Sequence, residues 1–430
     1  MDSIKLDEQR FVDLLSRLIG EVKHLQNNPP NHIPCEDRAG RHVLDELRPY
    51  SQEEGGPLKI QHISFVEGRG NIIVEYPGQP GGGIMSIVGS HLDVVTANPE
   101  TWDFDPFSLT RDGDKLRGRG TTDCLGHVAL LTQLFRELAI ARPPLQRSLV
   151  GVWISNEENS KVLGVGVDEL VKQGYLKHLL EGPLFWLDTA DSRPCIGTGG
   201  IIAWQLTAHG KMFHSGLPHQ SVNPLELASE ALAHLQRRFY QDFPPHPQEV
   251  KYGFATPSTM KPTQWSYPGG SINQIPGQAS VSGDCRLTPF YDLDKVMAAL
   301  QRYVEELNAD LSVLPTRGPV SKYSLPAEGL TGRLELTFYD AQSQGIACNL
   351  DSPGYHALLA AFQDVLGSCT PFAITGSLPC IRELQDEGYD VQTLGFGLLS
   401  TYHAVNEHAL LSDFVKGFRV LTRLIERLNQ

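Results

Sequence analysis

Residues 148–158, "SLVGVWISNEE", combine an apolar run with two adjacent glutamates at its end. A short apolar run rich in valine and aromatic residues is typical of a strand buried in a sheet. The carboxylates of Glu157 and Glu158 repel each other, and burying either of them is unfavourable unless a cation neutralises it. The stretch therefore predicts a buried strand that ends at a cation-binding site.

The sequence around this strand alternates between two patterns. Apolar runs typical of strands occur at 70–76, 84–95 and 183–188, and the apolar residues of 11–22 and 123–139 have helical spacing. Such alternation is typical of an α/β fold whose sheet is mostly parallel and carries helices on both faces. We predict this fold class for the first part of the chain.

The middle of the chain has a different pattern. Alternating, half-buried strands are indicated at 201–210 and 272–289, and amphipathic helices at 222–240 and 292–310. Two such strand–helix units predict a smaller α+β domain of the β-α-β-β-α-β type.

The length of 430 residues also favours two domains over one core. We assign the smaller domain to residues 198–347, as an insertion. The first domain would then comprise residues 1–197 and 348–430.

Composition narrows the class of protein. The formal net charge of -14 argues against nucleic acid and anionic membrane surfaces as partners. The seven cysteines are scattered without a C-x-x-C pair, which favours a reducing compartment. The N-terminus lacks a basic start followed by an apolar core, and apolar runs stay below transmembrane length. We therefore expect a soluble cytoplasmic protein.

Histidine and carboxylate side chains follow the predicted strands. The set comprises His91, Asp93, Glu157, Glu158, Asp188 and His403, together with Asp123 at the start of a helix. Taken alone, Asp123 also fits a helix N-cap and Asp188 the start of a turn. Because the carboxyl ends of parallel strands meet at one edge of a sheet, we expect the set to converge. Imidazole and carboxylate ligands suit Zn²⁺, Mn²⁺ or Co²⁺, and the set is large enough for two ions.

Five motifs carry a resemblance to a known family. The stretches "SHLDVV" (90–95), "GRGTTDCLGH" (118–127), "NEEN" (156–159), "HSG" (214–216) and "YHAVNEH" (402–408) occur in this order around an inserted domain. Together they resemble the dinuclear-zinc amidohydrolases, which include aminoacylases, desuccinylases and carnosinase. Longer stretches at 117–131, 242–265 and 272–277 are similar to plant-type acetylornithine deacetylases in particular.

The resemblance implies a ligand set for two zinc ions per subunit, with Co²⁺ as a substitute. Asp123 would bridge the ions, His91 and Asp188 would complete one site, and Glu158 and His403 the other. The family often has glutamate where Asp188 stands, so Asp191 is an alternative ligand. Asp93 would orient the imidazole of His91. Glu157 would be the general base that takes a proton from the attacking water and returns it to the leaving amine.

The resemblance also assigns roles in the inserted domain, which would act as a lid and as the interface of a homodimer. His214 would hydrogen-bond the tetrahedral oxyanion, often across the dimer interface, whereas His219 fits a surface loop. Asn273 and Arg286 would hold the carboxylate of the substrate, although a structural ion pair with Asp284 fits Arg286 equally well. Arg382 is a further candidate for this carboxylate.

The expected function is removal of the acetyl group from N2-acetyl-L-ornithine, a small-molecule substrate, in arginine biosynthesis. Alternatives are a related aminoacylase, desuccinylase or dipeptidase, or a non-catalytic binding protein on the same fold. An intact Glu157 beside a full ligand set argues against the last alternative.

Overall fold

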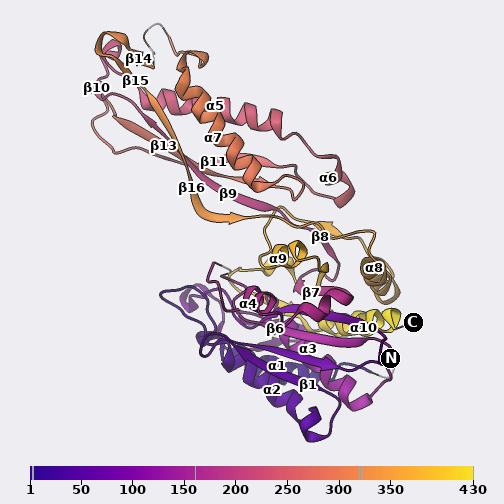
Figure 1. Ribbon diagram of the computed structural model, residues 1–430. Helices are drawn as coiled ribbons and strands as arrows, with labels where there is room; N and C mark the ends of the chain where they lie inside the picture. Colours follow the sequence, from indigo (N-terminus) through magenta and orange to yellow (C-terminus); the bar gives the residue numbers. More distant parts are fainter. Residues whose placement is uncertain (2–3, 160, 319, 321–322, 430) are drawn as a thin grey trace. The chain divides into compact units, whose positions relative to one another are not determined.

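The computed structural model describes residues 1, 4–159, 161–318, 320 and 323–429. Its contacts group the chain into two compact units (Figure 1). Unit 1 comprises Met1–Ile196, Cys348–Phe372 and Pro379–Gln430, and unit 2 comprises Gly197–Ala347 and Ala373–Leu378. The domain division that we drew from the sequence stays a prediction, because a grouping of contacts does not establish which segments fold on their own.

Unit 1 is built on a six-stranded sheet in the order β1-β2-β6-β3-β7-β18. The pairs of β6 with β3, β3 with β7 and β7 with β18 are parallel, whereas β1 and β2 add an antiparallel edge. The strands are β1 (Lys59–Ser64), β2 (Gly70–Tyr76), β3 (Ile84–His91), β6 (Ser148–Ile154), β7 (Pro183–Thr189) and β18 (Asp390–Gly395). The predicted α/β class with a mainly parallel sheet is confirmed.

Helices bury the central strands of this sheet. Every residue of β3 is buried, which requires cover on both faces. Helix α3 carries an almost continuous buried surface, and α1, α2 and α10 pack against it. The helices of unit 1 are α1 (Glu8–Gly20), α2 (Asp37–Leu47), α3 (Leu125–Ala141), α4 (Val167–Lys172), α8 (Pro353–Leu366), α9 (Ile381–Asp386) and α10 (Leu411–Leu428).

A three-stranded antiparallel sheet completes unit 1. Strand β5 (Lys115–Arg117) pairs with both β4 (Thr110–Asp112) and β19 (His408–Leu410). The pairing joins the segment before α3 to the segment before α10, two parts of the chain that are far apart in sequence.

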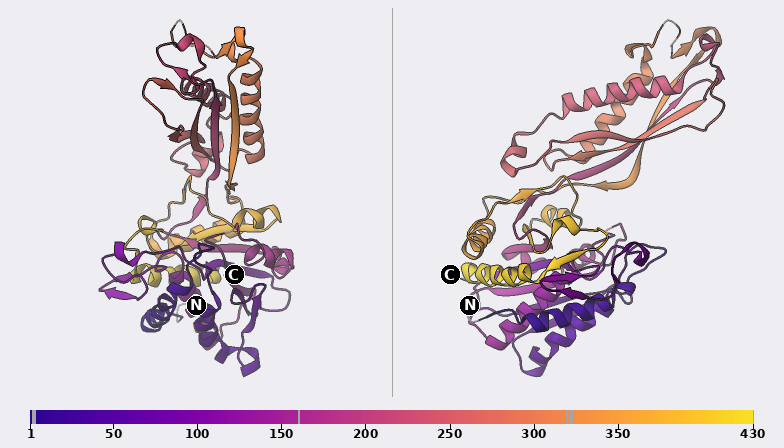
Figure 2. Two further views of the ribbon diagram at one scale, coloured as in Figure 1. Left: turned by 90° about the vertical axis from the view of Figure 1, so that its left-hand side faces the viewer. Right: turned by 180° about the vertical axis from the view of Figure 1, so that it is seen from behind.

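Unit 2 is a four-stranded antiparallel sheet in the order β11-β13-β9-β16. Helices α5 and α7 lie side by side on one face of it (Figures 1 and 2). Side chains of β9 alternate between buried and half-buried, so one face of the sheet supplies the core. Along the chain the elements are β9 (Gly200–His209), α5 (Pro224–Asp242), β11 (Thr259–Ser266), β13 (Gln278–Leu287), α7 (Leu293–Ala309) and β16 (Arg333–Ser343), the β-α-β-β-α-β order.

The chain also contains shorter elements. They are α6 (Pro247–Tyr252), the ribbon of β10 (Phe213–His214) with β12 (Gln274–Ile275), and the small strands β8 (Cys195–Gly197), β14 (Ser324–Leu325), β15 (Leu330–Thr331) and β17 (Phe372–Ala373). Among the residues described, no helix combines the length and apolar character needed to cross a bilayer.

Strand β3 contains an irregularity just before its last two residues. Its register with β6 shifts between Val88 and Ser90, and Gly89 between them has a φ of 97°. A Cβ atom at Gly89 would lie 2.5 Å from the Trp186 ring. The bulge therefore requires glycine, and it sets the direction in which His91 leaves the sheet.

We expect Gly89→Ala to lower the free energy of unfolding by about 2–5 kcal/mol, because strain at positive φ adds to the clash with Trp186. Gly81→Ala is the matched control: Gly81 also has positive φ, 78°, but open space surrounds its Cβ position. That variant should lose about 1–2 kcal/mol. Urea unfolding measures both losses, and equal losses would show that the Trp186 contact does not constrain the bulge.

Candidate metal centre

The polar cluster lies in unit 1 at the carboxyl ends of three neighbouring strands. His91 is the last residue of β3, Glu157 and Glu158 follow β6, and Asp188 is the penultimate residue of β7. Because β3 lies between β6 and β7 and is parallel to both, these ends meet at one edge of the sheet. Asp123 comes from the loop before α3.

Asp123 lies between two histidines. Its Oδ1 is 3.0 Å from Nε2 of His91, and its Oδ2 is 2.9 Å from Nε2 of His403. His403 Nε2 is also 3.1 Å from Oε2 of Glu158. Each oxygen of one buried carboxylate thus faces a different imidazole, the arrangement that a bridging carboxylate requires.

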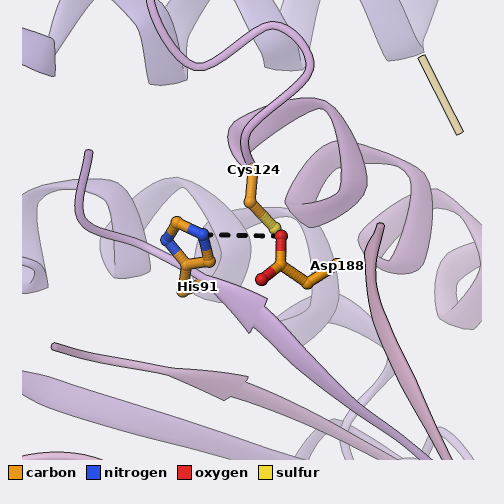
Figure 3. Close-up of side chains that lie close together, drawn as sticks. All are labelled: His91, Cys124 and Asp188. Atoms are coloured by element: carbon orange, nitrogen blue, oxygen red, sulfur yellow. Dashed lines mark ion pairs between the residues drawn. The ribbon is translucent and has the colours of Figure 1, made fainter. Parts of the chain in front are cut away.

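On the other side of His91 lies Asp188. Its Oδ1 is 3.6 Å from His91 Nε2, and the Cys124 side chain lies beside both groups (Figure 3). Glu157 Oε2 is 3.8 Å from the same imidazole nitrogen. The structure therefore brings together five of the predicted ligands: His91, Asp123, Glu158, Asp188 and His403.

The electrostatics of the cluster favour a bound cation. Burial raises the pKa of Glu157 well above its usual range, and that of Asp188 to about 6. Burial and the nearby Asp123 raise the pKa of Glu158 to about 7. Hydrogen bonds to Asp123 and Glu158 raise the pKa of His403 to about 11. These carboxylates crowd one another, so added positive charge would stabilise their ionised forms.

The donor set also fits divalent metal ions. Two subsets hold their ligand atoms within 4.8 Å of one another: His91 with Asp123 and Glu158, and His91 with Cys124 and Asp188. Asp188 Oδ1 is buried and lacks a hydrogen-bond partner among the described residues. A buried carboxylate oxygen without a hydrogen bond is costly unless a cation meets it. Histidine and carboxylate side chains therefore form a site that can hold metal.

Asp93 holds the turn that carries the two glutamates. Its Oδ1 accepts a hydrogen bond from the main-chain N–H of Glu157 and its Oδ2 from that of Glu158, each at 3.1 Å. His91 Nδ1 donates to the main-chain oxygen of Asp93 at 2.9 Å and lies 3.5 Å from the carboxylate. With a proton on Nδ1, Nε2 of His91 is available as a ligand.

Sequence reasoning missed a buried network behind Asp93. Asn27 Nδ2 donates to Asp93 Oδ2 at 2.7 Å and to Asn156 Oδ1 at 3.0 Å. Arg69, itself paired with buried Glu36, donates to the same Asn156 oxygen at 3.1 Å. The residue type of Asn156 was one indication, because asparagine is more common than most residues in the left-handed backbone conformation that it adopts here, with a φ of 66°. Asn27 and Arg69 are far in sequence from Asp93 and Asn156, and nothing in their residue type indicated these contacts.

Asp188 and its alternative Asp191 have different partners in the structure. The Asp191 carboxylate accepts a hydrogen bond from Leu399 N–H at 3.0 Å and pairs with Arg193 at 3.2 Å. It therefore holds the loop that leads to His403, whereas Asp188 approaches His91. Arg382 is partly exposed, and its guanidinium pairs with Asp386 within α9.

The remaining predicted residues lie in unit 2. His214 is exposed on β10, and Asn273 precedes the paired strand β12, with its main-chain oxygen bonded to Ser215 N–H. Arg286 on β13 forms an ion pair with Asp284, at 3.0 Å. This ion pair is the alternative that the sequence left open for Arg286.

Comparisons with known proteins agree with these observations. The family described as "Peptidase family M20/M25/M40" matches residues 87–427. The chain is 61% identical to acetylornithine deacetylase of Arabidopsis thaliana over 426 residues, 99% of this chain and 97% of that protein. It is 50% identical to acetylornithine deacetylase of Dictyostelium discoideum over 440 residues, 100% and 98% of the two chains. The resemblance inferred from the motifs is thus confirmed.

A solved structure has the same fold. Human carnosine dipeptidase 1 superimposes with a TM-score of 0.69 at 16% identity, over 100% of this chain and 98% of that one.

We expect Asn27→Asp to lower kcat by about tenfold or more, because a second carboxylate facing Asp93 would displace the turn that carries the two glutamates. The loss in free energy of unfolding should be about 1–3 kcal/mol. Asn71→Asp is the control: buried Asn71 loses a comparable bond, to Val165 O, but does not touch Asp93. It should lose similar stability and retain kcat. An equal loss of kcat in both variants would show that the network does not act through Asp93.

Proposed function

The chain belongs to peptidase family M20/M25/M40, and we propose that this hydrolase removes the acetyl group of N2-acetyl-L-ornithine to give ornithine and acetate. The observation that carries the proposal is the 61% identity to acetylornithine deacetylase of Arabidopsis thaliana over 99% of this chain. The reaction would be a cytoplasmic step of arginine biosynthesis. Membership of a hydrolase family leaves the non-catalytic alternative without support.

Two zinc ions are the proposed cofactors, with Co²⁺ as a substitute. His91 and Asp188 would hold one ion, Glu158 and His403 the other, and Asp123 both. This assignment is supported by the two oxygens of Asp123, which face the two histidines at 3.0 and 2.9 Å. When bound, such ions lower the pKa of a water ligand toward about 7 and polarise an amide carbonyl.

Glu157 is the proposed general base. The Glu158 side chain accepts a hydrogen bond from Val95 N–H at 3.2 Å and pairs with His403. The Glu157 side chain is held less closely than that of Glu158. The ion pair described for it is a long one, with Oε2 3.8 Å from His91 Nε2. Its carboxylate is thus available to take a proton from the attacking water and to return it to the leaving amine. Buried surroundings help such a group to hold the proton in between.

Unit 2 would supply the rest of the substrate site. We assign residues 198–347 as the lid domain and as the interface of a homodimer, and 1–197 with 348–430 as the catalytic domain. Exposed His214 would donate to the oxyanion of the tetrahedral intermediate, from the partner subunit in the dimer. Asn273 and Arg286 would bind the α-carboxylate of the substrate, with Arg382 as a further candidate. Both arginines sit in partly exposed ion pairs, which exchange partners at little cost.

Glu157→Gln should lower kcat by about 10²–10⁴-fold and leave metal content unchanged, because it removes the base and keeps the ligands. The neighbouring variant Glu158→Gln is the matched control, and it should lose bound metal. Metal analysis of both purified variants, with kcat at saturating substrate, separates the two roles. A Glu157→Gln enzyme that binds zinc normally and retains a tenth of the activity would exclude Glu157 as the base.

N2-acetylornithine should exceed N-succinyl-diaminopimelate by at least ~100-fold in kcat/KM, a difference of about 2.7 kcal/mol in activation free energy. The net charge of -14 favours a substrate with a cationic side chain over one with additional carboxylates. N-acetylmethionine should fall between them, and added salt should narrow the preference. Measuring kcat/KM for a panel of N-acyl amino acids and dipeptides tests this order of preference. Faster cleavage of a dipeptide than of every acetylated amino acid would refute the deacetylase assignment.

A further inference from the structure

Glu407 is a fully buried carboxylate four residues after His403. It accepts hydrogen bonds from three main-chain N–H groups of the loop that carries Asp123. Its Oε1 accepts from Thr122 at 2.8 Å and from Asp123 at 3.0 Å, and its Oε2 accepts from Gly120 at 2.9 Å. One side chain therefore holds the loop at the residue that lies between the two histidines of the metal centre.

A buried arginine completes the coordination of Glu407. Arg119 NH1 donates to Oε2 at 2.7 Å, and both side chains are almost fully buried. The guanidinium also lies over the Trp102 ring, 5.0 Å from its centre. With water excluded and four donors shared between two oxygens, the Glu407 carboxylate has a single well-defined position.

The loop is shaped to surround an anion. Gly120 adopts a φ of 90°, and its N–H group and those of Thr122 and Asp123 all point to the Glu407 carboxylate. The main-chain oxygen of Glu407 also accepts from Gly118 N–H at 3.1 Å. The next residue, His408, pairs with Arg117 in the β5–β19 ribbon. Residues 407–410, which follow His403, and residues 115–123, which lead to Asp123, are thus joined at several points.

We propose that Glu407 is a positioning residue that sets Asp123 against His403, an inference that rests on the proposed metal site. Glu407 acts through the main chain of Asp123. Glu407 belongs to the same segment as His403, and it accepts a hydrogen bond from the Asp123 N–H group. This bond fixes the distance between Asp123 Oδ2 and His403 Nε2, which is 2.9 Å. Because Asp123 would hold both ions, loss of the hydrogen bonds to Glu407 should both weaken metal binding and slow the reaction.

The test is Glu407→Gln, which keeps the shape of the side chain but replaces one acceptor oxygen with a donor. We expect Co²⁺ affinity, titrated by visible absorption, to fall at least about tenfold, a loss usual for groups that orient metal ligands. At saturating Co²⁺, kcat should fall at least about tenfold and KM should change less than about threefold. The d–d spectrum of bound Co²⁺ should also change.

Glu249→Gln is the matched control. Glu249 is a buried glutamate of unit 2 that accepts a hydrogen bond from Thr288 at 2.8 Å. The same chemical change there should leave Co²⁺ affinity and kcat within about twofold of wild type, as expected away from the network. Its melting temperature, measured without metal, shows what a buried Glu→Gln change costs by itself.

If Glu407→Gln does not fold, Glu407→Asp is used in its place. Aspartate keeps the negative charge, but its shorter side chain cannot reach all of the loop N–H groups that Glu407 bonds. It should show the same joint loss of Co²⁺ affinity and kcat. Wild-type affinity, spectrum and kcat in a folded Glu407 variant with a lowered melting temperature would overturn the proposal and leave a purely structural role. A wild-type protein that binds no Co²⁺ would instead refute the proposed metal site.

Discussion

The crowding of buried carboxylates at one edge of the unit 1 sheet is the constraint on which the rest of the site depends. Asp123, Glu157, Glu158 and Asp188 lie almost entirely out of water around His91. Each would be costly to bury alone, and together they repel one another. A cation bound at this edge would offset both costs.

The fold holds these acids in place by hydrogen bonds from the main chain. Asp93 accepts the N–H groups of Glu157 and Glu158, and Glu407 accepts those of the Asp123 loop. Neither carboxylate is among the proposed ligands. Each is paired with a buried polar partner, Asn27 in one case and Arg119 in the other. Two supporting carboxylates thus position the groups that would meet the metal.

Much of this could be predicted from the sequence. The central strands β3, β6 and β7 are apolar runs, so their burial and the polar residues at their ends were both visible. The edge strand β1 was missed because its side chains are mostly exposed and leave no apolar run. Edge strands β11 and β16 of unit 2 were not singled out either.

Of the supporting residues, Asp93 was predicted from the sequence, but Asn27 and Glu407 could not be. Asn27 meets Asp93 and Asn156 across 66 and 129 residues of sequence, and Glu407 meets Asp123 across 284. Helical or strand periodicity reports neighbours within one element, and contacts of this kind arise only when separate elements pack. The different surroundings of Asp188 and Asp191 also needed coordinates, because the two residues lie only three positions apart at the end of β7.

Anomalous X-ray diffraction at the zinc edge, from crystals of the zinc-loaded protein, tests the central claim most directly. The account predicts two zinc peaks about 3.5–4 Å apart, one on each side of the Asp123 carboxylate. His91 and Asp188 should lie beside one peak, and Glu158 and His403 beside the other. Zinc bound elsewhere, or zinc peaks that Asp123 does not touch, would contradict it.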